Sequence, residues 1–178
     1  PAIASAADGD FVVIWESYGA SVGDSSRTIQ GQRYTAAGVP QGAQFQVESY
    51  TTSAQRAPAV ASDANGNFVV VWKSFGSNSS DLSSYSIQGQ RYSAAGATQG
   101  TEFQVNSYTL GPQADPAIAS DADGGFVVVW HSNGSSGGDY LDRSIQGQRF
   151  AAEGAALGAQ FQVNSYTTGD QQIPAIAT

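Results

Sequence analysis

The sequence predicts an all-β fold built from tandem four-stranded antiparallel sheets, and three observations support this prediction. Within its 178 residues the chain repeats one segment three times and begins it a fourth time. The segment opens with Pro-Ala-Ile/Val-Ala, at spacings of 57, 58 and 58 residues, at Pro1, Pro58, Pro116 and Pro174. Each copy contains four short runs with the composition or alternation of strands, and no segment has a helical period. We therefore expect repeats at residues 1–57, 58–115 and 116–173, with residues 174–178 forming the first strand of a fourth repeat or a closing strand.

The first half of the third repeat predicts two strands joined by a turn. Residues 116–120 are short, apolar and compatible with a strand, and Pro116 is expected at the first position, where no backbone donor is needed. Residues 121–125, Asp-Ala-Asp-Gly-Gly, predict a tight turn because Asp and Gly accept positive φ. The β-branched and aromatic run 126–130 predicts a strand buried on both faces.

The second half predicts a loop and two further strands. Residues 131–143 are rich in Gly, Ser and Asp, which indicates a loop. Residues 144–150 alternate, with Ile145, Gly147 and Arg149 on one face, and predict the third strand. After a turn at 151–154, residues 159–166 alternate again and predict the fourth strand. The first and second repeats follow the same pattern.

Four short strands in each repeat of this length are typical of β-propeller blades, and the alternative is an array of small β-sandwich or solenoid units. Closed propellers usually need about four to eight blades, so three repeats leave three arrangements open. The chain is a fragment of a longer array, closes a ring with a second copy, or assembles head to tail without closing. In the second arrangement, strand 174–178 completes a partner's sheet by strand addition.

The composition excludes several classes of function. The net charge is −8 with only 7 Lys and Arg residues, which argues against nucleic acid as a partner. The chain has no Cys, so disulfides and thiol chemistry are excluded. No stretch approaches the roughly 20 apolar residues that span a bilayer, so no membrane span is expected.

The motif Pro-Ala-Ile-Ala-Ser-Asp-Ala-Asp-Gly-Gly-Phe-Val-Val-Val-Trp at 116–130 is followed by Ile-Gln-Gly-Gln-Arg-Phe and then by Phe-Gln-Val-Asn-Ser-Tyr. This combination resembles the tandem repeats of very large bacterial extracellular proteins of the RTX and adhesin-like type. The order of its motifs is also similar to that of NHL and integrin-type propeller blades. The resemblance extends over essentially the whole chain. It implies secretion, an extracellular or cell-surface location and Ca²⁺ as a cofactor. The turns depart from the integrin-type calcium loop, which needs several acidic oxygens in one turn.

Some residues recur at one position of every repeat, which favours a structural role. We interpret the tryptophans as core between blades, with sugar stacking as the alternative. We interpret the arginines as partners of carboxylates or backbone carbonyls between blades, with an anion site as the alternative. These positions are Trp15, Trp72 and Trp130, and Arg33, Arg91 and Arg149.

Two further sets of polar residues recur. The Gln pairs of the third strands are interpreted as solvated or ladder-forming, with carbohydrate binding as the alternative; they are Gln30/Gln32, Gln88/Gln90 and Gln146/Gln148. The turn acids are interpreted as turn formers, with Ca²⁺ coordination as the alternative, although a hard cation takes six to eight oxygens. They are Asp8, Asp10, Asp63, Asp121 and Asp123.

The loops that follow each Trp differ most between repeats, and binding residues commonly lie on such loops of a rigid scaffold. They extend over residues 16–27, 73–85 and 131–143. Their candidate binding residues are Asp24, Asp81, Tyr85, Asp139, Tyr140 and Asp142.

These observations predict an extracellular structural or adhesive module that displays variable loops on a rigid β scaffold and self-assembles through open sheet edges. Its expected partners are further copies or repeats of itself and cell-surface glycans. The alternative is a multivalent lectin-like propeller. An enzyme is not expected, because His131 has no second His or Cys beside it in the sequence and nearly identical copies do not build an asymmetric site. A propeller enzyme with carboxylates assembled across blades is the last alternative.

Overall fold

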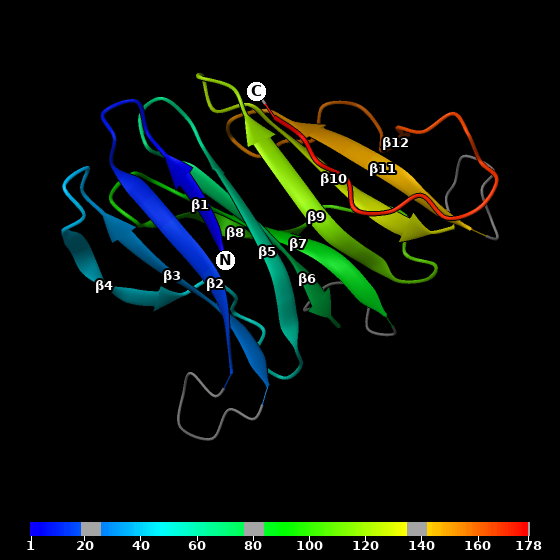
Figure 1. The fold of residues 1–178 in the computed structure, drawn as a ribbon, viewed down its shortest axis with the longest axis horizontal. Coiled ribbons are helices and arrows are strands. Elements are labelled where there is room, and N and C mark those ends of the chain that lie inside the picture. The colour runs from blue at the N-terminus through cyan, green and yellow to red at the C-terminus, as the bar shows by residue number, and fades with distance from the viewer. Residues whose placement is uncertain (19–25, 77–83, 135–141, 178) are drawn as a thin grey trace.

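A computed structural model describes residues 1–18, 26–76, 84–134 and 142–177, and each repeat forms one four-stranded antiparallel sheet in it. Figure 1 shows the three sheets side by side in chain order. The first sheet contains β1 (Ala2–Ser5), β2 (Phe11–Tyr18), β3 (Arg27–Tyr34) and β4 (Pro40–Gln46). The second contains β5 (Gln55–Ser62), β6 (Phe68–Phe75), β7 (Tyr85–Tyr92) and β8 (Thr98–Gln104). The third contains β9 (Gln113–Ser120), β10 (Phe126–Asn133), β11 (Arg143–Phe150) and β12 (Phe161–Gln162).

The predictions of an all-β fold and of four strands in each repeat are confirmed. Within each sheet the strands lie in sequence order, and each pairs antiparallel with the next. No described residue is helical. The described residues accordingly contain no helix long and apolar enough to cross a membrane.

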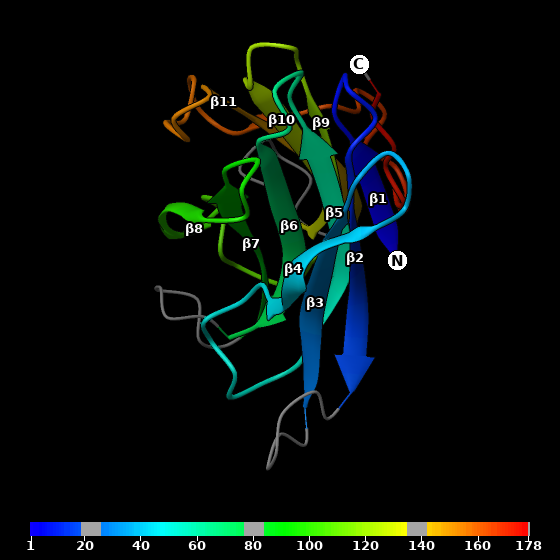
Figure 2. The same ribbon diagram turned by 90° about the vertical axis from the view of Figure 1, so that its left-hand side faces the viewer.

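The hydrophobic core lies in two layers, one on each side of the second sheet. Val12 and Ile14 pack against Val70 and Trp72 between the first and second sheets. A matching layer between the second and third sheets contains Val71, Val128 and Trp130. Because the second sheet is covered on both faces, β6 is buried from Phe68 to Trp72, whereas the equivalent part of β2, Phe11 to Trp15, alternates between half-buried and buried residues. Figure 2 shows this layering from the side of the first sheet.

The first strands of the second and third repeats begin earlier than predicted. β5 starts at Gln55 and β9 at Gln113, so Pro58 and Pro116 lie inside their strands and the placement of Pro116 at a strand start was wrong. Each proline follows a residue with positive φ, Ala57 at 49° or Asp115 at 51°. The register shifts at these points. A proline lacks the N–H that a ladder uses, and the irregularity lets the strand continue past it.

The fourth strands end earlier than predicted. β12 contains only Phe161–Gln162 instead of residues 159–166, and β4 and β8 end at Gln46 and Gln104. One backbone bond follows each strand end, from the N–H of Val47, Val105 or Val163 to the facing isoleucine carbonyl, and a side chain then replaces the next ladder bond. The N–H of Ile145 donates to Asn164 Oδ1 at 2.7 Å, and the equivalent N–H groups of Ile29 and Ile87 donate to Glu48 and Asn106.

The predicted loops after each Trp are shorter than expected. β2, β6 and β10 continue to Tyr18, Phe75 and Asn133, and the next strands begin at Arg27, Tyr85 and Arg143. His131, Tyr85 and Arg143 therefore lie on strands, which give them fixed positions at one end of the sheets.

Candidate functional site

Successive repeats are joined by aromatic contacts that recur at both junctions. At the first junction Phe45 packs against Phe68 and Tyr92, with ring centroids 6.4 and 5.5 Å apart. At the second, Phe103 packs against Phe126 and Phe150 at 6.3 and 5.6 Å. Each repeat therefore supplies one ring to a pair of rings in the repeat that follows.

The arginines Arg33 and Arg91 also cross the junctions. Arg33 Nη1 donates to the carbonyl of Ala94, and Arg91 Nη1 donates to that of Glu153, both in a turn of the following repeat. That turn needs glycine: a Cβ on Gly96 would lie 2.7 Å from Arg33 Nε, and Gly96 has a φ of +82°. Arg149, the third arginine of the series, is exposed, and its guanidinium makes no hydrogen bond to any described residue.

Smaller polar contacts repeat in the same way. Ser49 donates from its N–H and its hydroxyl to Glu102 Oε2, and Ser107 makes the same pair of bonds to Gln160 Oε1. The N–H of Ala7 donates to Ala64 O, and the N–H of Ala64 donates to Ala122 O. The two junctions thus share these aromatic, arginine, serine and backbone contacts.

The tryptophans Trp72 and Trp130 lie in the core layers and are completely buried. Each indole N–H donates to a buried amide, to Gln55 Oε1 at 3.0 Å and to Gln113 Oε1 at 2.8 Å. Trp15 lies on the outer side of the first sheet and is only half-buried. Two of the three rings are therefore closed to a sugar.

The Gln pairs are buried, so of the two structural interpretations, solvated or ladder-forming, the solvated one was wrong. Gln146 is 1% exposed and Gln148 4% exposed. Gln148 Nε2 donates to the carbonyls of Arg149 and Gly158 and so connects β11 to the chain that follows it. Gln32 and Gln90 make the equivalent bonds in the other repeats.

Four of the five turn acids, Asp8, Asp10, Asp63 and Asp121, accept hydrogen bonds from the backbone of their own or a neighbouring turn. Asp63 Oδ1 accepts from the N–H groups of Asn65 and Asn67, and Asp121 Oδ1 accepts from those of Asp123 and Gly125. Asp8 and Asp10 accept the equivalent kind of bond from Asp10 and Ala36. Among the described residues, no group of three or more His, Cys, Asp or Glu side chains could hold a metal ion.

The opposite end of the sheets carries the variable loops, and part of the prediction lies outside the described residues: Asp24, Asp81, Asp139 and Tyr140. Tyr85 begins β7, where its ring contacts Phe75 edge-on at 5.0 Å and lies under Lys73 Nζ at 4.5 Å. Asp142 Oδ2 accepts a hydrogen bond from the N–H of Gly169 at 2.9 Å. The structure does not bring these two residues together in one contact.

The strand ends at this side hold different side chains in each repeat. Glu16 and Arg27 form an ion pair in the first repeat. The equivalent positions hold Lys73 and Tyr85 in the second repeat, and His131 and Arg143 in the third. One backbone position therefore presents an acid, a cation or an imidazole, which changes the chemistry while the scaffold stays the same.

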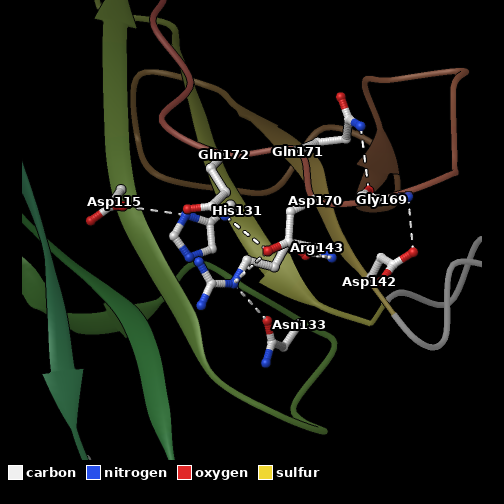
Figure 3. A network of polar contacts seen from close by, with 9 residues as sticks. All are labelled: Asp115, His131, Asn133, Asp142, Arg143, Gly169, Asp170, Gln171 and Gln172. Carbon is white, nitrogen blue, oxygen red and sulfur yellow. Dashed lines mark hydrogen bonds and ion pairs between the residues drawn. The ribbon is translucent and has the colours of Figure 1, made fainter.

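Figure 3 shows a cluster of polar side chains at this end of the third repeat. His131 Nδ1 lies 3.3 Å from Asp115 Oδ2, although the angle does not make a hydrogen bond. Arg143 Nε donates to Asn133 Oδ1 and lies 4.0 Å from Asp170 Oδ2. Burial lowers the pKa of His131, and Asp115 opposes that shift only in part. At neutral pH the lowered pKa therefore favours the neutral imidazole of His131.

A cleft of about 350 Å³ opens between the second and third repeats beside this cluster. Its walls include Lys73, Tyr85, Asp115, His131 and Arg143. Two cations, a carboxylate and an aromatic ring around one hollow suit a polar ligand. Except for Tyr85, sequence reasoning did not select these residues for binding. The available sequence signal was that the side chains at these strand ends differ between repeats, although the strands themselves are repeated.

A second feature missed in the sequence is the buried carboxyl of Glu48, which is 4% exposed. Desolvation raises its pKa to about 7, despite a hydrogen bond from the N–H of Ile29. The equivalent residues are the neutral amides Asn106 and Asn164. The available sequence signal was that the first repeat has Glu where the other two repeats have Asn.

In comparisons with known proteins, no family model and no curated protein matches the chain.

Proposed function

We propose that this chain is an extracellular structural or adhesive module, in which successive propeller-type blades hold varied surface chemistry on a rigid β scaffold. The observation that carries the proposal is the contrast between the two ends of the sheets. The aromatic contacts, and an arginine bond to a turn of the following repeat, recur in both places where repeats meet. The loop ends differ, with Glu16, Lys73 and His131 at one equivalent position. A scaffold that keeps the contacts between its repeats while the side chains at one end vary is suited to displaying that end to a partner.

The resemblance to RTX and adhesin-like repeats supports the bacterial cell surface as the location and association between copies as part of the role. The face-to-face stacking of sheets, with the first strand of each repeat against the preceding sheet, supports propeller-type blades over separate sandwiches. Glycans at a cell surface are the proposed partners, and the mixed charge of the cleft beside Lys73 and Arg143 fits their hydroxyl and acidic groups.

A lectin is the second candidate, because the cleft sets the Tyr85 ring beside hydrogen-bonding groups, an arrangement that suits a sugar ring. The differing loop ends favour display over this candidate, since a multivalent lectin needs equivalent pockets in each repeat.

The test is binding of the labelled chain to fixed bacterial cells and to a glycan array. The double variant Lys73→Ser/Arg143→Ser should weaken cell binding at least about tenfold, because it removes both cations of the cleft. The control Glu153→Gln, which changes an exposed side chain at the opposite end of the third sheet, should leave binding unchanged. Absence of cell binding by the wild-type chain, or equal loss in the control, would refute the proposal. Inhibition by one free glycan would favour the lectin. Loss of binding in a chelator would show the Ca²⁺ dependence that the resemblance implies.

A further inference from the structure

The outer faces of the first and third sheets are the two separate halves of the junction that joins the repeats. We propose that a second copy of this chain docks there head to tail, with the third sheet of one copy against the first sheet of the next. This inference rests on the proposed structural role, but it uses sheet faces instead of the sheet edges expected from the sequence.

The third sheet exposes the apolar side chains that the other two sheets bury against a following repeat. Val163 is 53% exposed, whereas the equivalent Val47 and Val105 are 6% and 4% exposed. Phe161 is 41% exposed, while its equivalents Phe45 and Phe103 lie against the ring pair of the next repeat. The third sheet therefore exposes the phenylalanine that at the internal junctions packs against a ring pair of the next repeat.

The first sheet holds the ring pair that would accept this phenylalanine. Phe11 and Tyr34 stack with centroids 5.1 Å apart and planes 12° apart, as Phe68 and Tyr92 do at 4.8 Å and 10°. Ile3, on the same side, is 65% exposed. The equivalents of Ile3 at the two internal junctions, Val60 and Ile118, are 8% and 9% exposed. The ring pair that receives Phe161 is thus already formed.

The polar contacts are complementary as well. Arg149 is exposed on the third sheet. On the first sheet, the turn that contains Gly38 is the one that Arg149 of another copy would reach, and a Cβ on Gly38 would have no neighbour within 4 Å. Ser165 is the equivalent of Ser49 and Ser107. Gln44 donates to Gln30 in the way that Gln160 donates to Gln146, and Gln160 Oε1 accepts from Ser107. Gln44 Oε1 is therefore aligned to accept from Ser165 of the other copy.

A second copy is the partner that these faces fit, because each contact class of the internal junction has one half on each face. Such a contact is heterologous and continues until it closes into a ring or forms a filament. Residues 174–177 repeat the Pro-Ala-Ile-Ala of residues 1–4, so the second copy's β1 takes the place that this segment would occupy. The segment forms no strand, so its displacement would break no strand pairing.

The test measures molar mass by light scattering against concentration up to about 1 mM, a range that detects weak association. The wild-type mass should rise with concentration. Phe161→Glu blocks the third sheet and Ile3→Glu blocks the first, and each variant alone should stay monomeric. An equimolar mixture of the two should form a heterodimer that does not grow, since one open face of each kind remains. Leu110→Glu adds the same charge at a side chain 71% exposed outside the junction positions, and it should behave as wild type.

A wild type that stays monomeric, blocked variants that still associate, or a mixture without heterodimer would each overturn the inference. Ile176→Asp separates face docking from strand exchange: association should be unchanged or tighter, and its loss would show exchange with β1 and overturn face docking. The Phe161→Glu monomer also serves in the cell-binding assay. Binding by this monomer would support the display role even where docking fails, and its failure to bind would count against display alone.

Discussion

At the scale of single residues, Glu48 makes the first repeat chemically different from its neighbours. Its side chain performs the same task as Asn106 and Asn164, which is to accept the N–H of an isoleucine where the ladder ends. A carboxyl loses hydration at this buried position, and an amide does so at much lower cost. The first repeat thus contains a titratable group in the layer that joins it to the second.

Glu48 should make the fold less stable as the pH rises. Its pKa of about 7 lies above the ordinary 4.5, so the folded chain binds more protons between these values, and stability falls from about pH 5 to pH 8. The loss approaches about 3 kcal/mol. Glu48→Asn should remove most of this slope and stabilise the protein above pH 7, as measured by urea unfolding at several pH values. An unchanged slope in the variant would contradict the assignment.

At the scale of elements, the central Gly of each Gln-Gly-Gln motif lets the strands β3, β7 and β11 accept an aromatic ring. A Cβ on Gly89 would lie 2.6 Å from Phe103 Cζ, and one on Gly147 would lie 2.7 Å from Phe161 Cζ. The two rings differ in their surroundings, because Phe103 is packed between sheets and Phe161 is 41% exposed. The same substitution therefore meets a fixed ring in one strand and a movable ring in another.

Gly89→Ala should destabilise the fold by about 1–3 kcal/mol, since Phe103 cannot move without disturbing the second junction. Gly147→Ala is the matched control and should cost clearly less, because Phe161 can swing outward. Chemical denaturation at low protein concentration compares the two variants. Equal costs would mean that the ring over Gly89 is as free as the ring over Gly147.

The sequence was sufficient for the number and order of the strands but insufficient for several of their bounds and for the contacts between sheets. The period and the run Phe126–Trp130 predicted β10, because β-branched residues and turn signals act locally. The early end of β12 depends on Asn164 reaching the backbone of Ile145 in another strand, which no local pattern encodes. The cleft around Lys73 and His131 likewise depends on how two repeats pack.

At the scale of the whole molecule, the second sheet is the only one of the three covered on both faces in the described structure. We expect amide hydrogen exchange to be slowest in β6 and β7 and fastest in the edge strands β1 and β12. Mass spectrometry of exchanged peptides measures this order, at a concentration where the chain is monomeric. Exchange in β1 as slow as in β6 would show that protection does not follow the layering.

The arginine bonds and aromatic contacts of each junction run in one direction, from a repeat to the one that follows it. On a ribosome, the side chains of a finished sheet must therefore wait for the next 58 residues before they are covered. At ordinary synthesis rates of about 5–20 residues per second, the wait is about 3–12 s. During that interval the ring of Phe45 or Phe103 is exposed to solvent on the nascent chain. Translation speed therefore sets how long the growing protein can associate wrongly with other proteins through this ring.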